Sequence, residues 1–320
     1  MSWRVLKFGG TSVGTPAALL AACDLVRQAA AESRPLVVVS ALSGVTSEIA
    51  CQLESALARD PAWRDGFRAL RERHRGQLAA VARGRAAVAA ADALDRALER
   101  LRDLLRAVEL LGEASPRTRA WVLAGGERMS TPIFAAALST AGLAAEAVDG
   151  TEVLVADGPH EDARPDVDAS GPKLAARLAA LGGALPVVSG FFGGGAAGEV
   201  RLFGRGGSDT SATALGAVLA AERVEIWTDV DGVATADPRL DPAAELLPWL
   251  SYDAVEALAR GGAKVLHWKA VAPARAAGVP IVVRNTFRPH GRGTWIGAEP
   301  ALHAASRPAR VWNGGPPLLC

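Results

Sequence analysis

The chain has 320 residues, 50% of them hydrophobic and 22% charged, which excludes a disordered or peptide-like protein. Its 35 basic and 34 acidic residues leave a formal net charge of +1, so bulk charge recruits neither nucleic acid nor an anionic membrane surface. The three cysteines, Cys23, Cys51 and Cys320, have no paired spacing, which argues against a disulfide framework or a zinc ribbon and favours a reducing compartment.

The first half of the chain opens with a strand, a helix and a second strand, the order that predicts a parallel sheet. Apolar residues then recur every three or four positions between numerous Arg and Glu residues, which is typical of helices with a solvated face. The expected elements are strand Val5–Phe8, helix Pro16–Ala31, strand Leu36–Val39, helical Ser47–Leu111, helix Met129–Thr140, and strands Ala144–Val148 and Leu185–Val188.

The second half repeats the alternation of strands and helices, so the whole chain is predicted to be α/β. We expect one continuous sheet carrying two lobes, hinged near Gly190–Gly198. The expected elements are strand Val200–Phe203, helix Ser208–Ala221, strand Val224–Thr228, helices Tyr252–Ala259 and Val265–Ala276, and strand Val279–Arg284.

The sequence predicts neither export nor a membrane span. The start, Met1–Phe8, runs into a strand-like segment and lacks an apolar signal core. The longest apolar runs, Ala212–Ala221 and Pro35–Val39, are far shorter than the ~20 residues that cross a bilayer. We therefore expect a cytoplasmic protein without membrane or nucleic-acid partners.

The first motif that carries chemistry is KFGGTSVG (Lys7–Gly14), where the first strand passes into a helix. Paired glycines let the backbone approach a ligand closely, and a helix amino terminus favours an anion. Lys7 is one of only four lysines in the chain, the others being Lys173, Lys264 and Lys269. An ordinary turn is the plain alternative, but Lys, two Gly and Thr-Ser together favour a phosphate site.

The second motif is FGRGGSDTSA (Phe203–Ala212), again a glycine-rich turn before a helix. Ser208 is expected to cap that helix, and Asp209 places a carboxylate in its first turn. Arg205 offers a planar fork for a carboxylate or phosphate, although a surface cation is the plain alternative. Two such turns in one α/β chain indicate that two anionic groups meet at the carboxyl edge of the sheet.

Two further motifs follow in the second half. WTDVDGVATADPR (Trp227–Arg239) holds an Asp pair but lacks the remaining ligands of a calcium loop, so an EF-hand is excluded. GGAKVLH (Gly261–His267) sets Lys264 after two glycines at a helix start, which favours a ligand role over a solvated lysine. Gly193, Gly195 and Gly198 match G-x-G-x-x-G, but a strand follows, so a hairpin is expected rather than a dinucleotide site.

Together, KFGGTSV, GERMST (Gly126–Thr131), GRGGSD, WTDVDG with ADPR, and GAKVLH resemble, in this order, the aspartate kinases of the amino-acid kinase superfamily. The resemblance covers about Trp3 to Trp295. It implies a three-layer αβα sandwich of the carbamate kinase-like type, with a mostly parallel central sheet. The implied kinase domain spans 1–298, with an amino-acid lobe over 1–190, an ATP lobe over 191–298 and a short tail over 299–320.

The resemblance also implies the reaction: transfer of the γ-phosphoryl group of MgATP to the side-chain carboxylate of L-aspartate. The implied catalytic residues are Lys7, Lys264 and Asp209, the lysines stabilising the transferring group and the aspartate orienting them. Implied ligands of the phosphate are Gly9, Gly10 and Thr11; of the amino acid, Ser40, Thr46, Glu127, Phe191, Arg205 and Ser208; and of the nucleotide, Thr228, Asp229, Arg239 and Lys264. ATP and Mg²⁺, carried by the nucleotide, are the implied cofactors, and a homodimer is expected.

Physical chemistry supports this assignment independently. A carboxylate acceptor with a pKa near ~4 is ionised at neutral pH and needs no general base. The reaction then needs alignment and charge neutralisation, which lysines and glycine amides supply. Glu127 could bind the substrate ammonium and Arg205 its α-carboxylate, so a free α-amino acid suits the pair.

Three features depart from the usual aspartate kinase pattern. Only about twenty residues follow residue 300, where the family commonly carries two regulatory ACT modules, so we expect no ACT domain and no feedback inhibition of the usual kind. The usual Tyr of the nucleotide loop is Ala234, and the usual Pro after GAKVLH is Trp268. Two alternatives therefore stay open: a kinase for another small carboxylate or phosphate, and a non-catalytic relative that binds a nucleotide or amino acid.

Overall fold

A computed structural model of the chain describes residues 1–236, 243–260 and 266–298. Within these ranges an eight-stranded sheet runs through the molecule, and β1 lies inside it between β2 and β9. In spatial order its strands are β10 (Trp249–Leu250), β12 (Thr294–Ile296), β11 (Ile281–Asn285), β9 (Arg223–Thr228), β1 (Trp3–Phe8), β2 (Arg34–Val39), β6 (Leu185–Ser189) and β3 (Ala145–Val148).

The sheet is mostly parallel, as the sequence predicts. β1 pairs in parallel with both β2 and β9, and β6, β3 and β11 continue the same direction. β12 runs antiparallel to β11, and β10 pairs in parallel with β12, so these two edge strands point the other way. The carboxyl ends of six neighbouring strands therefore meet at one edge, where an α/β sheet binds its ligands.

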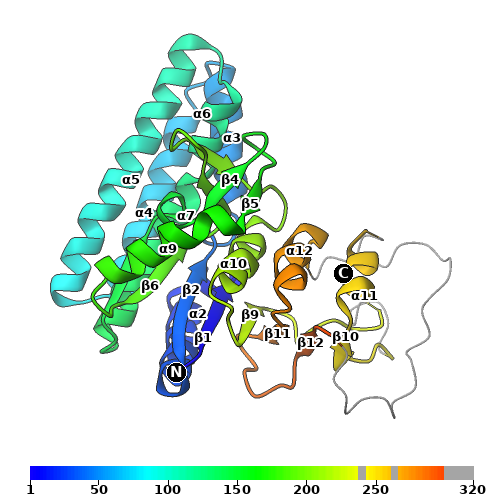
Figure 1. The fold of residues 1–320 in the computed structure, drawn as a ribbon. Helices are drawn as coiled ribbons and strands as arrows, with labels where there is room; N and C mark the ends of the chain where they lie inside the picture. The colour runs from blue at the N-terminus through cyan, green and yellow to red at the C-terminus, as the bar shows by residue number, and fades with distance from the viewer. Residues whose placement is uncertain (237–242, 261–265, 299–320) are drawn as a thin grey trace.

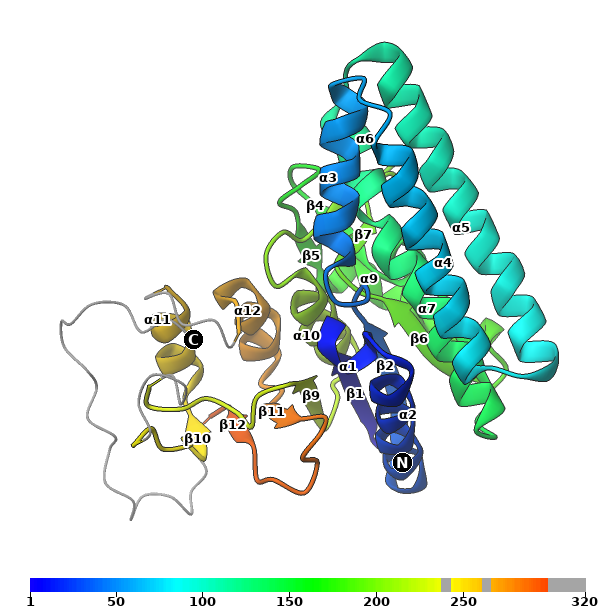
Figure 2. The same cartoon turned by 180° about the vertical axis from the view of Figure 1, so that it is seen from behind.

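Helices cover both faces of the sheet, which confirms the three-layer sandwich (Figures 1 and 2). Successive strand residues point to opposite faces, so Leu6 and Phe8 enter one core while Val5 enters the other. The first face is covered by α2 (Pro16–Glu32), α3 (Val45–Leu57), α4 (Trp63–Val81), α5 (Gly84–Leu111) and α7 (Gly125–Thr140). The second is covered by α9 (Val167–Ala180), α10 (Gly207–Val218), α11 (Tyr252–Arg260) and α12 (Trp268–Ala277).

A second, four-stranded sheet lies beside the first, so the expectation of one continuous sheet is wrong: the predicted strand Val200–Phe203 belongs to this second sheet. Its order is β5 (Arg164–Asp166), β4 (Val155–Asp157), β7 (Phe192–Gly194) and β8 (Val200–Leu202). β7 and β8 are antiparallel, so the glycine-rich segment is a hairpin and not a dinucleotide turn, as predicted. Phe192 of β7 packs with Ala120 and Ala124 in a small separate core next to α6 (Pro116–Leu123).

Two short helices begin near the sheet edge: α1 (Gly10–Val13) and α8 (Gly150–Val153). One expected cap is wrong. Helix α10 begins at Gly207 with Gly206 as its N-cap, and Gly206 takes a left-handed conformation at φ 69°, so Ser208 lies inside the first turn. In the described part of the chain, no helix combines the length and apolar character needed to cross a membrane.

Candidate active site

A buried ion pair stands at the centre of the carboxyl edge of the sheet. Lys7, next to last in β1, shares the face of Val5 and so points toward α10, where Asp209 lies in the first turn. The Lys7 Nζ atom lies 2.5 Å from Asp209 Oδ1, and the two side chains are only 10% and 14% exposed. Two predicted catalytic residues, 202 positions apart in the chain (209 − 7), are thereby brought into contact.

The glycine turn after β1 lies against the loop that follows β2. The Gly9 N–H donates to the Trp227 carbonyl at 3.1 Å, which continues the sheet and uses that amide. Gly10 opens α1, where the first N–H groups have no partner inside the helix. A Cβ on Gly10 would lie 3.0 Å from the Ala41 carbonyl oxygen, so the close approach requires glycine. The amides of Gly10 and Thr11 are therefore better placed than that of Gly9 to receive a phosphoryl oxygen.

Glu127, in the first turn of α7, is a buried carboxyl group with an unused oxygen. Its residue is 3% exposed, and Oε1 accepts a hydrogen bond from the Ala41 N–H at 3.1 Å. Oε2 is buried and has no hydrogen-bond partner among the described residues. Burial raises the pKa of Glu127 to about 8, although the Ala41 amide and the charge of Lys7 act in the opposite direction. An orphaned oxygen of this kind suits a bound cation.

Two further predicted amino-acid ligands, Ser40 and Thr46, lie at the end of β2 and at the start of α3. The Ser40 carbonyl accepts a hydrogen bond from the Ser130 hydroxyl of α7 at 2.8 Å, and the Ser40 N–H donates to Phe8. Thr46 is half-buried in the first turn of α3, just after Gly44. Ser40, at the end of β2, and Glu127 therefore face the same edge from neighbouring elements.

Phe191 packs against the start of α10, next to the glycine loop 204–207. Phe191 has φ 78°, a left-handed conformation that is rare for a bulky residue and marks a constrained site. A Cβ on Gly207 would lie 2.6 Å from the Phe191 ring, and one on Gly190 would lie 2.9 Å from the Ser208 Cβ. Arg205 is exposed in the loop and forms no ion pair within the described residues.

The predicted nucleotide residues divide between described and undescribed parts of the chain. Thr228 ends β9, and its hydroxyl donates to the Asp229 carboxylate at 3.0 Å. Arg239 and Lys264 lie outside the described residues. The described part of the chain contains no group of three or more His, Cys, Asp or Glu side chains arranged to bind a metal.

A polar group beside Thr228 is not predicted by the sequence motifs. The Asn285 amide, at the end of β11, donates to the Asp229 carbonyl at 3.2 Å and to the Asp231 carboxylate at 2.8 Å. The next residue, Thr286, shares a 2.7 Å hydrogen bond with the Ser12 hydroxyl of α1. The available signal was the polar pair directly after the predicted strand Val279–Arg284, at the same carboxyl edge.

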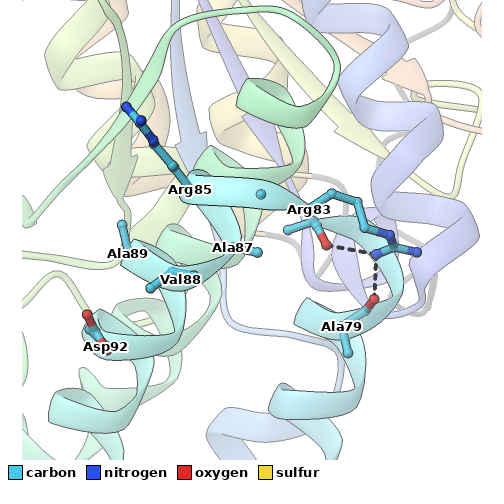
Figure 3. A pocket seen from close by; sticks show the side chains of 9 residues that line it. Ala79, Arg83, Arg85, Ala87, Val88, Ala89 and Asp92 are labelled. Atoms are coloured by element: carbon cyan, nitrogen blue, oxygen red, sulfur yellow. Dashed lines mark hydrogen bonds between the residues drawn. The ribbon is translucent and has the colours of Figure 1, made fainter.

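A large hollow elsewhere on the surface is not part of this site. It has a volume of about 890 Å³ and lies where α4 passes into α5, lined by small apolar residues with Arg83, Arg85 and Asp92 (Figure 3). The Arg83 N–H donates to the Thr140 hydroxyl at the last residue of α7. Glu127 stands in the first turn of that helix, about 20 Å away along its axis at 1.5 Å per residue.

Comparison with known proteins decides the family. Residues 2–285 match the amino acid kinase family, which is most of the chain. The chain belongs to the amino acid kinase family. The fold agrees, since the structure superposes on that of Escherichia coli aspartokinase III in complex with aspartate and ADP with a TM-score of 0.83 and 32% identity. That superposition covers 93% of this chain and 65% of the other.

Curated relatives within the amino acid kinase family are similar over almost the whole chain. Aspartokinase 1 of Arabidopsis thaliana, a chloroplastic protein, is 32% identical over 299 residues, or 91% of this chain and 51% of its own length. The aspartokinase of Chlamydia muridarum is 33% identical over 296 residues, or 92% of this chain and 63% of its own. The chain thus spans about half to two thirds of the length of these relatives.

Proposed function

We propose that this amino acid kinase transfers the γ-phosphoryl group of MgATP to the side-chain carboxylate of L-aspartate, forming 4-phospho-L-aspartate. The observation that carries the proposal is the buried Lys7–Asp209 pair beside the orphaned Glu127 oxygen at one sheet edge. The first supplies a cation for a phosphoryl group, and the second supplies an acceptor for an ammonium group. The similarity to aspartokinases supports the same substrates.

The proposed reaction needs no general base. One carboxylate oxygen of aspartate attacks the γ-phosphorus, and the bond from that phosphorus to the oxygen bridging to ADP breaks, so ADP leaves with that electron pair. Lys7 lies where its charge offsets the negative charge of the transferring group, and Asp209 holds its ammonium in place. The amides of Gly10 and Thr11 donate to the phosphoryl oxygens, and Lys264 is proposed as the second cation.

The substrate is proposed to be held by its two α-groups. The ammonium group of aspartate pairs with Glu127, whose Oε2 is otherwise without a partner among the described residues. The α-carboxylate pairs with Arg205, a guanidinium that the structure leaves unpaired in its described part. The binding pocket for aspartate is proposed to include four further residues, Ser40, Thr46, Phe191 and Ser208.

The nucleotide is proposed to bind on the other side of Lys7, over the lobe 191–298, while 1–190 holds the amino acid. Thr228, Asp229, Arg239 and Lys264 are its proposed contacts, and magnesium enters with ATP. We further propose a homodimer acting in the cytoplasm.

The test is a hydroxylamine trap. Protein, MgATP, aspartate and hydroxylamine are expected to give aspartyl hydroxamate, because hydroxylamine attacks an acyl phosphate. The Lys7→Met variant is the matched control, and a signal no greater than that control overturns the proposal. A panel of other small carboxylates and phosphates, run in parallel, tests the alternative acceptor, and nucleotide binding without turnover on any acceptor would favour a non-catalytic relative.

A further inference from the structure

Lys269 is a lysine to which the sequence analysis assigned no role. In the structure its ammonium group pairs with the Asp162 carboxylate, 107 positions away in the chain. Lys269 lies in the first turn of α12, and Asp162 lies in the loop between β4 and β5. The Lys269 side chain is 14% exposed and that of Asp162 is 64% exposed, so the lysine is held inside while the carboxylate faces solvent.

The glycine loop 204–207, which carries Arg205, lies in space between two segments that we call its anchors: the loop around Asp162 and the start of α12. A Cβ on Gly204 would lie 2.7 Å from Asp162 Oδ1, and a Cβ on Gly206 would lie 2.5 Å from the His267 Cβ. Both glycines have left-handed backbones, with φ of 71° and 69°. The loop therefore lies between Asp162 on one side and the start of α12 on the other. A side chain at position 206 would clash with His267, whereas one at position 204 would displace the exposed Asp162 carboxylate.

Each anchor is itself fixed. The Leu202 N–H donates to the His160 carbonyl at 2.7 Å, and the Ala163 N–H donates to the Leu202 carbonyl at 2.8 Å, so Asp162 is tied to β8 from both sides. On the other side, His267 caps α12 by accepting from the Lys269 N–H at 3.4 Å. The Asp162–Lys269 pair joins these two anchors across the loop.

We propose that the Asp162–Lys269 ion pair clamps the loop 204–207 and thereby positions Arg205 for the substrate α-carboxylate. This inference rests on the proposed function and deepens it, and it makes Asp162 and Lys269 positioning residues. The physical reason is that Arg205 stands between two glycines, whose backbones are the least restricted in a chain. A guanidinium pairs well with a carboxylate only in a narrow geometry, so the loop needs external restraint.

The charges around the clamp agree with this role. Burial lowers the pKa of His267, and the neighbouring Lys269 and Arg205 lower it further, which favours the neutral form of the imidazole. Asp162 and Asp209 are the carboxylates that act on this group in the opposite direction. Since Asp209 is already paired with Lys7, Asp162 is the carboxylate that offsets Lys269.

The test compares Lys269→Ala and Asp162→Ala with the double charge swap Asp162→Lys/Lys269→Asp. The control is Lys173→Ala, an exposed lysine whose ammonium, among the described residues, donates a hydrogen bond to the Thr151 carbonyl alone, at 3.4 Å. In the hydroxamate assay we expect each single variant to raise the KM for aspartate about 5- to 10-fold, as the loss of a partly exposed ion pair and the geometry it holds would do. The KM for ATP is expected to stay within about 2-fold, and the charge swap to restore most of the aspartate KM.

A second measurement does not depend on activity. Hydrogen exchange of the unliganded protein should be faster for the amides of 203–210 in Lys269→Ala than in the wild type and in Lys173→Ala. Unchanged exchange, together with an aspartate KM equal to that of Lys173→Ala, overturns the clamp. Equal increases in the KM for aspartate and the KM for ATP, together with a lower Tm and no rescue by the charge swap, also overturn it. A wild-type protein without hydroxamate activity overturns the proposed function instead, while hydrogen exchange still decides on the clamp.

Discussion

At the scale of single residues, the candidate site combines a buried ion pair with a buried carboxyl group. Lys7 and Asp209 form an ion pair, whereas Glu127 has one oxygen bonded and one without a partner in the described structure. Each arrangement predicts a different response to substitution. Removing one member of a buried ion pair leaves the other charge buried without a partner, whereas replacing an unpaired carboxyl group removes the cost of burying it.

For Lys7 we expect Lys7→Met to lower kcat by about 10³-fold while the Kd for aspartate changes little, because the cation acts mainly on the transferring phosphoryl group. Single-turnover kinetics separate the two effects. Thermal unfolding provides the control for folding, since the variant leaves Asp209 unpaired. Comparable losses in aspartate binding and in kcat would contradict a role in the transition state.

Glu127 predicts a pH dependence of substrate binding. With its pKa raised to about 8 by burial, the carboxyl group is protonated in the free protein at neutral pH and has to lose that proton to pair with an ammonium group. The KM for aspartate should therefore fall as pH rises from 6 toward 8.5. In Glu127→Gln the KM should be higher throughout and lack this slope. A pH profile parallel to the wild type in the Gln variant would assign the slope to another group.

The same group predicts the pH dependence of stability. A folded-state pKa of about 8 against an ordinary 4.5 means that the folded protein holds a proton which the unfolded chain has lost. The contribution of protonated Glu127 to the free energy of unfolding is complete below pH 4.5, declines as pH rises, and is lost once pH passes about 8. Relative to the wild type, Glu127→Gln should thus gain more in Tm at pH 8.5 than at pH 5. Scanning calorimetry of both proteins across this range is the measurement.

At the scale of elements, glycines decide where loops and helices can meet. Gly206 has φ 69° and no room for a Cβ, which would lie 2.5 Å from that of His267. Gly278, the C-cap of α12, has nearly the same φ of 67° but nothing within 4 Å of an added Cβ. The pair separates backbone strain from crowding.

We expect Gly278→Ala to lower the free energy of unfolding by about 1 kcal/mol, the cost of a left-handed Ala. Gly206→Ala should cost about 2 kcal/mol more, because the loop and α12 have to move apart. Urea unfolding of the two variants measures the difference. Equal costs would show that the contact between Gly206 and His267 is loose.

The elements that the sequence predicted share a strong apolar pattern. The helical region Ser47–Leu111 was expected as helix and resolves into α3, α4 and α5, whose buried residues recur at helical spacing. The sequence pattern predicts no helix or strand in the segment 150–184, although this segment forms α8, β4, β5 and α9. Helix α9 buries only Ser170 and Leu174, and β4 and β5 have three residues each, so their periodicity is too weak to read.

At the scale of the whole molecule, the sheet is completed by the last described strand. β12 lies between β10 and β11, and the Gly297 N–H donates to the Leu250 carbonyl at 3.1 Å. The proposed domain 1–298 includes this strand. Its boundary can therefore be tested by two truncations that differ by only a few residues.

A chain ending at residue 298 is expected to keep its Tm within about 2 °C of the full chain. A chain ending at residue 292 loses β12 and leaves β10 without its partner, so its Tm should fall by about 10 °C or more. Circular dichroism melting of both chains is the measurement. A large fall in Tm for the chain ending at residue 298 would move the domain boundary beyond that residue.

The sequence predicts the α/β class, the parallel sheet and the motifs of the candidate active site. It does so because strands and helices have distinct apolar periods and because a lysine near the end of a strand, followed closely by paired glycines, is rare without a chemical reason. It also assigned Ser208 as a helix cap, which was wrong: the glycine before the helix takes the left-handed conformation and the helix begins one residue earlier.

Which of these residues meet depends on the tertiary structure. No local pattern indicates that Lys7 pairs with Asp209, that Asn285 lies beside Asp229, or that Lys269 reaches Asp162. These contacts arise because parallel strands distant in sequence end at the same edge and helices pack across them. A linear sequence states which groups are present, whereas burial and the register of the sheet determine which charges are paired and which groups, like the Glu127 carboxyl group, keep an oxygen without a partner in the described structure.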